Sequence, residues 1–288
     1  MSERRAAPTV GQVVLGIRLR ELREAAGFGR DGAARVLRVA PATIRRMETA
    51  EVALKIPYVQ VLLSAYGVPE AEVAAFAALA EEVNGPGWWQ RYHDVLPDWF
   101  SLYVSLESSA RMIRSYEPHF VPGLLQTEAY ARAVLESGTI GASGDRESVD
   151  RHVALRMERQ RLLRGENPPH LWVIMDETVL RRPVGGGGRV MREQLDALLE
   201  SAALDRVTLQ VAEFAAGPHP GTYAPFTLFR FGEPELPDMV FTEYLTGALY
   251  LDSRGEVSRH LRVLDHMTAL AASGRRTEKI LRGHREAH

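Results

Sequence analysis

The sequence predicts a two-domain protein in which an all-helical head of five helices precedes an α/β body with a small mixed sheet covered by helices. Apolar residues recur at helical spacing up to residue 83, and the breaker cluster Asn84-Gly85-Pro86-Gly87 follows. Short apolar runs alternate with helical segments after residue 166. The expected parts are a head at 11–83, a body at 84–274 with a helical neck at 84–165 and mixed sheet and helices at 166–274, and a basic tail at 275–288.

Length and composition agree with two packed domains. The 288 residues exceed the usual ~100–200 of one domain, and 45% are hydrophobic. The chain has no cysteine, which excludes disulfides and thiolate metal sites, and we expect neither a metal nor a cofactor. We also expect a cytoplasmic protein without signal peptide or membrane span, because no sufficiently long apolar run occurs.

Charge is distributed unevenly along the chain, although the total is only −2. Residues 1–57 hold 11 Lys and Arg against 6 Asp and Glu, a net charge of +5, whereas the remainder carries −7. A nucleic-acid-binding head on an acidic body has this distribution, because the neutralisation of phosphates needs local positive charge. Basic residues are also stable on any solvated face, so charge alone supports DNA binding only weakly.

Helical periodicity defines the head. The first helix is expected from Val14 to Ala26, with Gly27 as a stop, and the second from Arg30 to Leu37. The third begins at Pro41, because the first turn of a helix tolerates a residue without an N–H, and runs to Thr49. A fourth at 57–66 and a fifth at 69–83 complete the head. Two short helices joined by a tight turn form the unit that enters the DNA major groove.

The third helix has one apolar and one polar face. Ile44 and Met47 form its inward pair. The outward positions are Ala42, Arg45, Arg46 and Thr49. An arginine can donate two hydrogen bonds to guanine O6 and N7, so the outward face predicts contact with base edges.

Seven residues are candidates for DNA contact. Those expected near base edges lie in the first half of the third helix: Pro41, Ala42, Arg45 and Arg46. Those expected at phosphates, which position the protein without specifying sequence, are Arg30, Thr43 and Lys55. For each basic residue the alternative is a surface charge without a partner.

Three segments carry a family resemblance: LGIRLRELREAAGF, AARVLRVAPATIRRME and YVQVLLSAYGV. Over about residues 11–80 they resemble the lambda-repressor-like (Xre-type) helix-turn-helix family. The resemblance implies a sequence-specific transcriptional regulator that binds a pseudo-palindromic operator in double-stranded DNA as a homodimer.

The chain departs from the family pattern in the turn and at two arginines. Arg38 stands where the family has a glycine, and Ala40 stands where it has a capping serine, so we expect a strained turn without a side-chain cap. Arg30 and Arg45 replace a usual glutamine and serine. We interpret both changes as altered operator specificity. A degenerate domain that only dimerises is the alternative.

The body shows helical patterns first and strands later. Helices are expected at 101–115, 127–137, 147–164, 189–203 and 255–273. Buried strands are expected at 171–175, 207–211, 226–231, 239–242 and 248–251.

The body also carries a resemblance, in segments that include RSYEPHFVPGLLQTEAYARAVL, LWVIMDETVLRRPVGG and EYLTGALYLD. They resemble the C-terminal domain of a large actinobacterial set of antitoxin-like Xre-type regulators, commonly encoded beside a very small companion protein. The resemblance implies a body that binds this companion or receives a signal. The alternative is a protein that mainly sequesters the companion and binds DNA only for autoregulation.

Aromatic and apolar residues of the neck are the candidate partner surface, because such side chains concentrate at interfaces. They are Trp88, Trp89, Tyr92, Trp99, Phe100, Phe120 and Pro122. The alternative is that they staple the neck to the body.

An enzyme that uses Asp176 and Glu243, with His219 nearby, is a further hypothesis, since α/β folds place catalytic groups at strand ends. Carboxylates at strand ends are also ordinary helix caps and arginine partners. We therefore expect no enzymatic activity.

Overall fold

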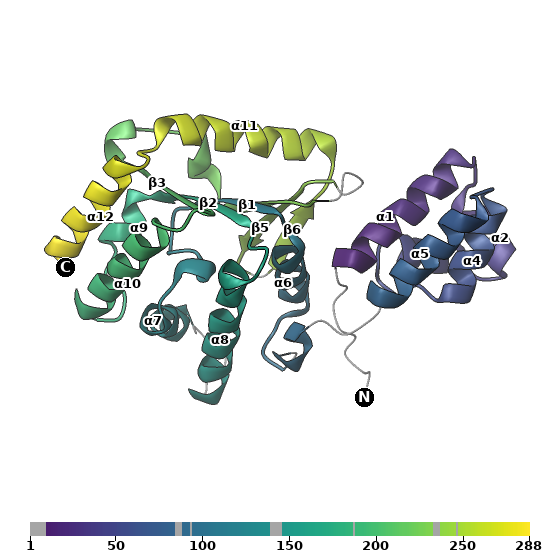
Figure 1. The fold of residues 1–288 in the computed structure, drawn as a ribbon, viewed down its shortest axis with the longest axis horizontal. Coiled ribbons are helices and arrows are strands. Elements are labelled where there is room, and N and C mark those ends of the chain that lie inside the picture. The colour runs from purple at the N-terminus through teal and green to yellow at the C-terminus, as the bar shows by residue number, and fades with distance from the viewer. Residues whose placement is uncertain are drawn as a thin grey trace. The chain divides into compact units, whose positions relative to one another are not determined.

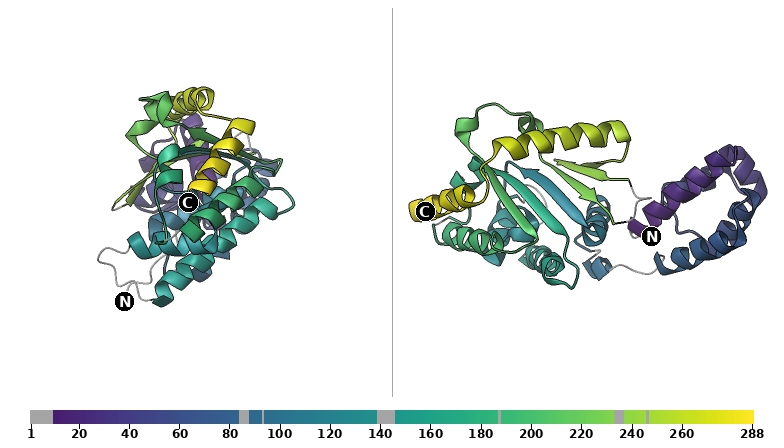
Figure 2. Two further views of the ribbon diagram at one scale, coloured as in Figure 1. Left: turned by 90° about the vertical axis from the view of Figure 1, so that its left-hand side faces the viewer. Right: turned by 45° about the horizontal axis from the view of Figure 1, so that its top comes forward.

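The structure is a computed structural model that describes residues 10–83, 88–92, 94–138, 146–186, 188–232, 237–245 and 247–288. The chain divides into two compact units, residues 1–109 and 110–288 (Figures 1 and 2). The expected boundary at 84–87 lies outside the described residues. The division observed follows Ser109, immediately before the first strand of the sheet.

In its described residues, the first unit contains helices joined by turns and no strand. Its helices are α1 (Val10–Ala25), α2 (Arg30–Leu37), α3 (Pro41–Glu48), α4 (Ile56–Ala65), α5 (Glu70–Val83), the 3₁₀ segment η1 (Trp88–Tyr92) and α6 (Asp98–Ser109). The expected bounds of the second helix are confirmed, and the others shift by a few residues at their ends. Fully buried side chains from α1, α3 and α4 share one core: Leu19, Ile44, Val59, Leu62 and Leu63.

Helix α1 packs directly on the end of α3 at Gly16. A Cβ at this position would lie 2.6 Å from the carbonyl oxygen of Glu48 and 3.0 Å from that of Met47. Only glycine allows this approach, because no heavy atoms can be so close without displacement of the backbone. The close approach brings the last turn of α3 against α1.

The turn between α2 and α3 has the strained geometry that the sequence predicts. Arg38 ends α2 in the left-handed region, with φ 56° and ψ 45°, a conformation that costs an L-residue ~1–2 kcal/mol. Ala40 precedes α3 with φ −71° and ψ 146° and makes no side-chain cap hydrogen bond. Both departures from the usual turn therefore lower the stability of the connection between α2 and α3.

Replacing Ala40 with serine is expected to stabilise the first unit by about 0.5–2 kcal/mol, because its extended backbone already fits an N-cap. Thermal unfolding of the full chain, followed by circular dichroism, measures the change. Ala53→Ser, at an exposed position outside the helices, is the matched control and should leave the midpoint unchanged. Equal midpoints for the two variants would contradict the capping argument.

The second unit is built on a six-stranded mixed sheet. Its strands are β1 (Met112–Glu117), β2 (His170–Asp176), β3 (Val207–Ala212), β4 (Phe226–Arg230), β5 (Met239–Tyr244) and β6 (Gly247–Leu251), in the order β3-β2-β1-β4-β5-β6. β1 pairs in parallel with β2, and β2 with β3, whereas the pairs β1–β4, β4–β5 and β5–β6 are antiparallel. The parallel and antiparallel halves of the sheet therefore meet at β1.

Helices cover both faces of this sheet (Figures 1 and 2). One face packs on α11 (Arg254–Leu270), where Tyr116, Ile174 and Leu228 meet Leu264 and Met267. The opposite side carries α7 (Glu128–Gly138), α8 (Arg146–Arg159) and α10 (Gly188–Ser201). The shorter elements are η2 (Gly123–Leu125), η3 (Gln160–Arg164), α9 (Glu177–Arg181), η4 (Phe214–Ala216) and η5 (Pro220–Tyr223).

Two expectations for the body are wrong. The helix expected at 101–115 ends at Ser109, and residues 112–117 form β1. The segment expected as a basic tail is a packed helix: residues 275–287 form α12 (Arg275–Ala287), which packs on α10, β3 and α9. Its Leu281 is fully buried, so apolar burial stabilises this basic helix.

In the described ranges, no helix is long and apolar enough to cross a membrane.

Candidate nucleic-acid interface

Helix α3 presents a polar face to solvent, as its periodicity predicts. The expected inward pair is confirmed, since Ile44 is 0% and Met47 2% exposed. The predicted outward and first-turn residues divide into an exposed set, Pro41, Ala42, Arg45 and Thr49, and a partly buried set, Thr43 and Arg46. The accessible part of the helix is therefore the face that carries Pro41, Ala42 and Arg45.

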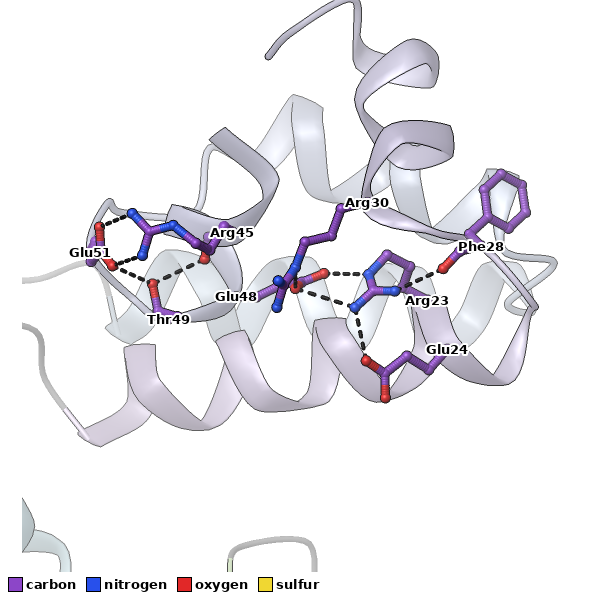
Figure 3. A network of polar contacts seen from close by, with 8 residues as sticks. All are labelled: Arg23, Glu24, Phe28, Arg30, Arg45, Glu48, Thr49 and Glu51. Carbon is purple, nitrogen blue, oxygen red and sulfur yellow. Dashed lines mark hydrogen bonds and ion pairs between the residues drawn. The ribbon is translucent and has the colours of Figure 1, made fainter. Parts of the chain in front are cut away.

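A buried carboxylate joins the first three helices (Figure 3). Glu48 of α3 accepts hydrogen bonds from Nε of Arg23 in α1 at 2.5 Å and from Nε of Arg30 in α2 at 3.0 Å. Arg23 also donates to the carbonyl oxygen of Phe28 at 2.7 Å and to Glu24 at 2.9 Å. Sequence periodicity did not indicate this network, because Glu48 is 25 residues from Arg23 and 18 residues from Arg30 along the chain.

Burial makes this network sensitive to the loss of any one member. The side chains of Arg23 and Glu48 are 6% and 1% exposed. The hydrogen bond with Glu48 raises the pKa of Arg23, so its charge is fixed. A buried ion pair that satisfies its hydrogen bonds is tolerated, whereas one charge left alone is not. The network therefore fixes α2 and α3 relative to α1.

Arg30 has a structural contact besides its expected contact with phosphate. Its side chain is 44% exposed and its Nε is committed to Glu48. Lys55, the other expected phosphate contact beyond α3, lies just before α4 and is exposed, with its Nζ 5.6 Å from the centre of the Tyr58 ring. Both residues are exposed basic side chains of the helix-turn-helix region.

Arg45 has a carboxylate partner that the sequence analysis missed. Its two terminal nitrogens donate to the two carboxylate oxygens of Glu51, with Nη2 to Oε2 at 3.0 Å. Glu51 lies six residues after Arg45 and beyond the end of α3, so the helical i, i+3 and i+4 spacings do not indicate the pair. Arg46 differs, since its Nε donates to the carbonyl oxygen of Ala42 at 3.3 Å.

Two family models match the chain. The first, described as "Helix-turn-helix domain", matches residues 14–76 and so includes α2, α3 and the turn between them. The second, described as "Domain of unknown function (DUF5753)", matches residues 100–283, which is more than half of the chain. The chain belongs to the DUF5753 family. Its N-terminal part is a helix-turn-helix domain, which indicates DNA binding.

No curated protein and no solved structure matches the chain.

The aromatic residues expected to bind a partner do not form one exposed surface. Trp89 and Tyr92 are buried at 6% and 7% exposure, which corrects their assignment as partner anchors. Trp88, Trp99, Phe100 and Pro122 are partly buried, and Phe120 is the most exposed of the seven at 38%. The rings of Trp88 and Trp89 pack edge to face, with centres 5.9 Å apart. These contacts support the alternative in which the aromatic side chains serve packing.

The turn at 118–126 is held inside the DUF5753 domain. Gln160 Nε2 donates to the carbonyl oxygens of Gly123 and Gln126 at 3.0 and 2.6 Å, and Gln194 Nε2 donates to that of Leu125 at 2.7 Å. Leu124 and Leu125 are buried. The turn therefore serves to connect η2 with α10 and η3, and its side chains Val121, Leu124 and Leu125 are buried away from any partner.

The two carboxylates of the enzyme hypothesis lie far apart. Asp176 ends β2, where its Oδ1 accepts from Thr178 N at 2.8 Å and caps α9. Tyr116 donates to its Oδ2 at 3.3 Å, and His219 Nε2 lies 3.7 Å from the same oxygen. Glu243 is in β5, separated from β2 by three strand spacings or about 14 Å. The geometry does not pair Asp176 with Glu243.

Glu117, which the sequence analysis did not single out, is electrostatically coupled to Glu243. The two residues are in β1 and β5, which flank β4. Burial, followed by the negative charge of Glu243, raises the pKa of Glu117 to about 8. Glu243 is exposed, but partial desolvation raises its pKa, and Arg156 and Arg159 of α8 oppose this effect. Register across the sheet, which is a long-range property, brings these carboxyl groups together.

His284 of α12 and His288, which follows the end of that helix, have the i, i+4 spacing of metal ligands but contact different groups. His284 Nε2 lies 3.5 Å from Glu177 Oε1, whereas a ring nitrogen of His288 lies 2.8 Å from the carbonyl oxygen of Leu180. Burial lowers the pKa of His284, and Glu177 opposes the shift. Over the residues that the structure describes, no group of three or more candidate ligands could hold a metal ion.

Proposed function

We propose that this chain is a cytoplasmic transcriptional regulator of the Xre type that binds a pseudo-palindromic operator as a homodimer. The observation that carries the proposal is the polar face of α3, with the exposed Arg45 and the partly buried Arg46 on it, inside a region that matches a helix-turn-helix domain. One such helix reads only a few base pairs, so useful specificity requires two copies on half-sites about 34 Å, one helical turn, apart.

The network around Glu48 supports the same function. A recognition helix must be held rigidly, because base contacts depend on its angle to the groove. Glu48 connects α3 to α1 through Arg23 and to α2 through Arg30. The short turn between α2 and α3 cannot provide this rigidity alone, since it lacks a cap and contains the left-handed Arg38.

We propose that the DUF5753 domain controls DNA binding by taking up a small companion protein, without catalysis. The sequence resemblance to antitoxin-like actinobacterial regulators supports this role. The cap made by Asp176 and the separation of Asp176 from Glu243 favour binding over catalysis. If the companion favours one DNA-competent arrangement, a coupling of ~1–3 kcal/mol would change operator affinity 5- to 150-fold.

The DNA-binding proposal is tested on the operator selected by the full chain from a random duplex pool. Arg46→Ala is expected to weaken binding to that operator by about 1–3 kcal/mol and to relax the preference at one base pair. Mobility shifts on the operator and on single-base-pair variants measure both effects. We expect the loss of base preference because an arginine on the groove side of α3 would contact a base edge rather than a phosphate.

Lys55→Ala is the matched basic control, because a lysine beyond α3 is expected to contact only phosphate. It should weaken binding to all duplexes about equally and lower the salt dependence. A wild-type chain that selects no sequence would overturn the function. Wild-type behaviour of both Arg45→Ala and Arg46→Ala on every duplex would show that α3 is not the recognition helix.

A further inference from the structure

The end of α3 folds back so that Glu51 lies beside Arg45 (Figure 3). Thr49 terminates the helix, and Ala50 follows in the left-handed region with φ 55°. This reversal of the backbone brings the Glu51 carboxylate to the terminal nitrogens of Arg45, with Nη2 to Oε2 at 3.0 Å. Because a left-handed alanine is costly, the surrounding structure must stabilise the reversal.

A third side chain holds the carboxylate in place. The hydroxyl oxygen of Thr49 lies 3.0 Å from Oε1 of Glu51 and 3.0 Å from the carbonyl oxygen of Arg45. The hydroxyl has one hydrogen for these two acceptors, and when it donates to Glu51 it connects the carboxylate to the end of α3. Arg45 and Thr49 hydrogen bonds lower the pKa of Glu51, so it is ionised at neutral pH.

The pair leaves three of the five N–H donors of the guanidinium available for DNA. A guanidinium has five N–H donors, and a carboxylate bound across the two terminal nitrogens uses one hydrogen of each. The Nε–H and a second hydrogen on the adjacent terminal nitrogen then form another parallel pair of donors. Such a pair matches O6 and N7 of guanine in the major groove. The Glu51 contact and a guanine contact can therefore exist together.

Exposure of the pair agrees with a positioning role. The side chains of Arg45 and Glu51 are 46% and 42% exposed, and an ion pair in water contributes little to folding stability. A free arginine loses rotamer entropy when it binds a base. An arginine already held by a carboxylate loses less, which favours the single base that fits the remaining donors.

We propose that Glu51 is a positioning residue that orients Arg45, so that the operator half-site contains a guanine opposite the free edge of that guanidinium. This inference rests on the proposed function, and it adds the base that Arg45 reads and the residue that enforces the choice. Glu51 would also repel phosphates weakly, so its removal changes specificity and general affinity in opposite directions.

The test measures binding of the full chain to the selected operator and to calf thymus DNA. It also uses operator variants in which each half-site position carries, in turn, each of the four possible base pairs. Glu51→Gln is expected to lower the preference for guanine at one position by about tenfold, while its affinity for calf thymus DNA stays equal or rises. Thr49→Val should lower the same preference by a smaller factor. The double variant Arg45→Ala/Glu51→Gln should discriminate no less than Arg45→Ala alone, because both act on one contact.

Glu21→Gln is the matched control, since Glu21 forms an exposed ion pair with Arg18 at 3.5 Å in α1. It should leave discrimination at every position unchanged. If Glu51→Gln raises the affinity for all duplexes equally and keeps the guanine preference, Glu51 is only a surface charge and the inference fails, while the proposed function stands. If the wild type selects no sequence, both fail.

Discussion

Replacing Glu48 by alanine is expected to lower the free energy of unfolding of the helix-turn-helix domain by about 3–5 kcal/mol. The substitution leaves the charge of Arg23 buried at 6% side-chain exposure, without the carboxylate that it contacts at 2.5 Å. Arg30 loses its partner at the same time. Hydrogen exchange of the full chain, resolved by peptide, should show faster exchange in α1, α2 and α3 and unchanged exchange in the sheet.

The matched control is Glu24→Ala, because Glu24 contacts the same Arg23 at 2.9 Å but is 60% exposed. We expect it to cost less than ~1 kcal/mol, as exposed pairs do. Operator binding by the Glu48→Ala variant should decrease in proportion to the fraction of molecules whose helix-turn-helix domain is folded. Equal exchange rates in the two variants would mean that Glu48 does not hold these helices together.

Local patterns were sufficient to predict most of the helix-turn-helix domain. The positions of Ile44 and Met47 follow from a 3.6-residue period, and the strained turn at Arg38 follows from a missing glycine. The polar contacts of the same domain did not follow, since Glu48 and Glu51 find their arginines across helices or beyond a helix end. Side-chain pairs at non-helical separations leave no periodic signal.

Strand β1 shows why a central element escaped sequence analysis. The spacing of Leu102, Leu106, Ala110 and Ile113 suggests one helix, but the chain becomes extended at Met112. Arg114 occupies this buried strand at 9% exposure, where a charge needs partners. Its terminal nitrogens donate to Asp265 at 3.0 Å and Thr268 at 3.2 Å, both in α11. These partners are more than 150 residues away, so no local pattern could indicate them.

Two residues of the candidate partner surface, Trp89 and Tyr92, are buried for a related reason. An aromatic residue has the same sequence signature in a core and at an interface, and only the fold decides which atoms remain accessible. Trp89 is 6% exposed and Phe120 is 38% exposed, although both were assigned to the same surface. Composition identified the residues with large apolar side chains, but it could not show how much of each side chain stays accessible to solvent in the folded protein.

The C-terminal helix α12 is expected to contribute strongly to the stability of the DUF5753 domain. Leu281→Ala is expected to lower the free energy of unfolding of the DUF5753 domain by about 2–5 kcal/mol, because the side chain is fully buried where α12 packs on α10 and β3. Arg285 adds an ion pair with Asp196 of α10, with Nη2 to Oδ2 at 3.0 Å. Urea denaturation of the full chain, followed by circular dichroism, measures the loss.

Lys279→Ala tests whether the effect comes from burial or from the helix itself. Lys279 is exposed in the same helix, and alanine favours helix formation at least as well as lysine, so its removal should cost less than ~0.5 kcal/mol. A difference of several kcal/mol between the two variants requires that α12 is part of the folded core. If both variants unfold at the same urea concentration, residues 275–288 form the solvated basic tail that their composition alone suggests, and the packing of α12 on the sheet contributes nothing to the stability of the domain.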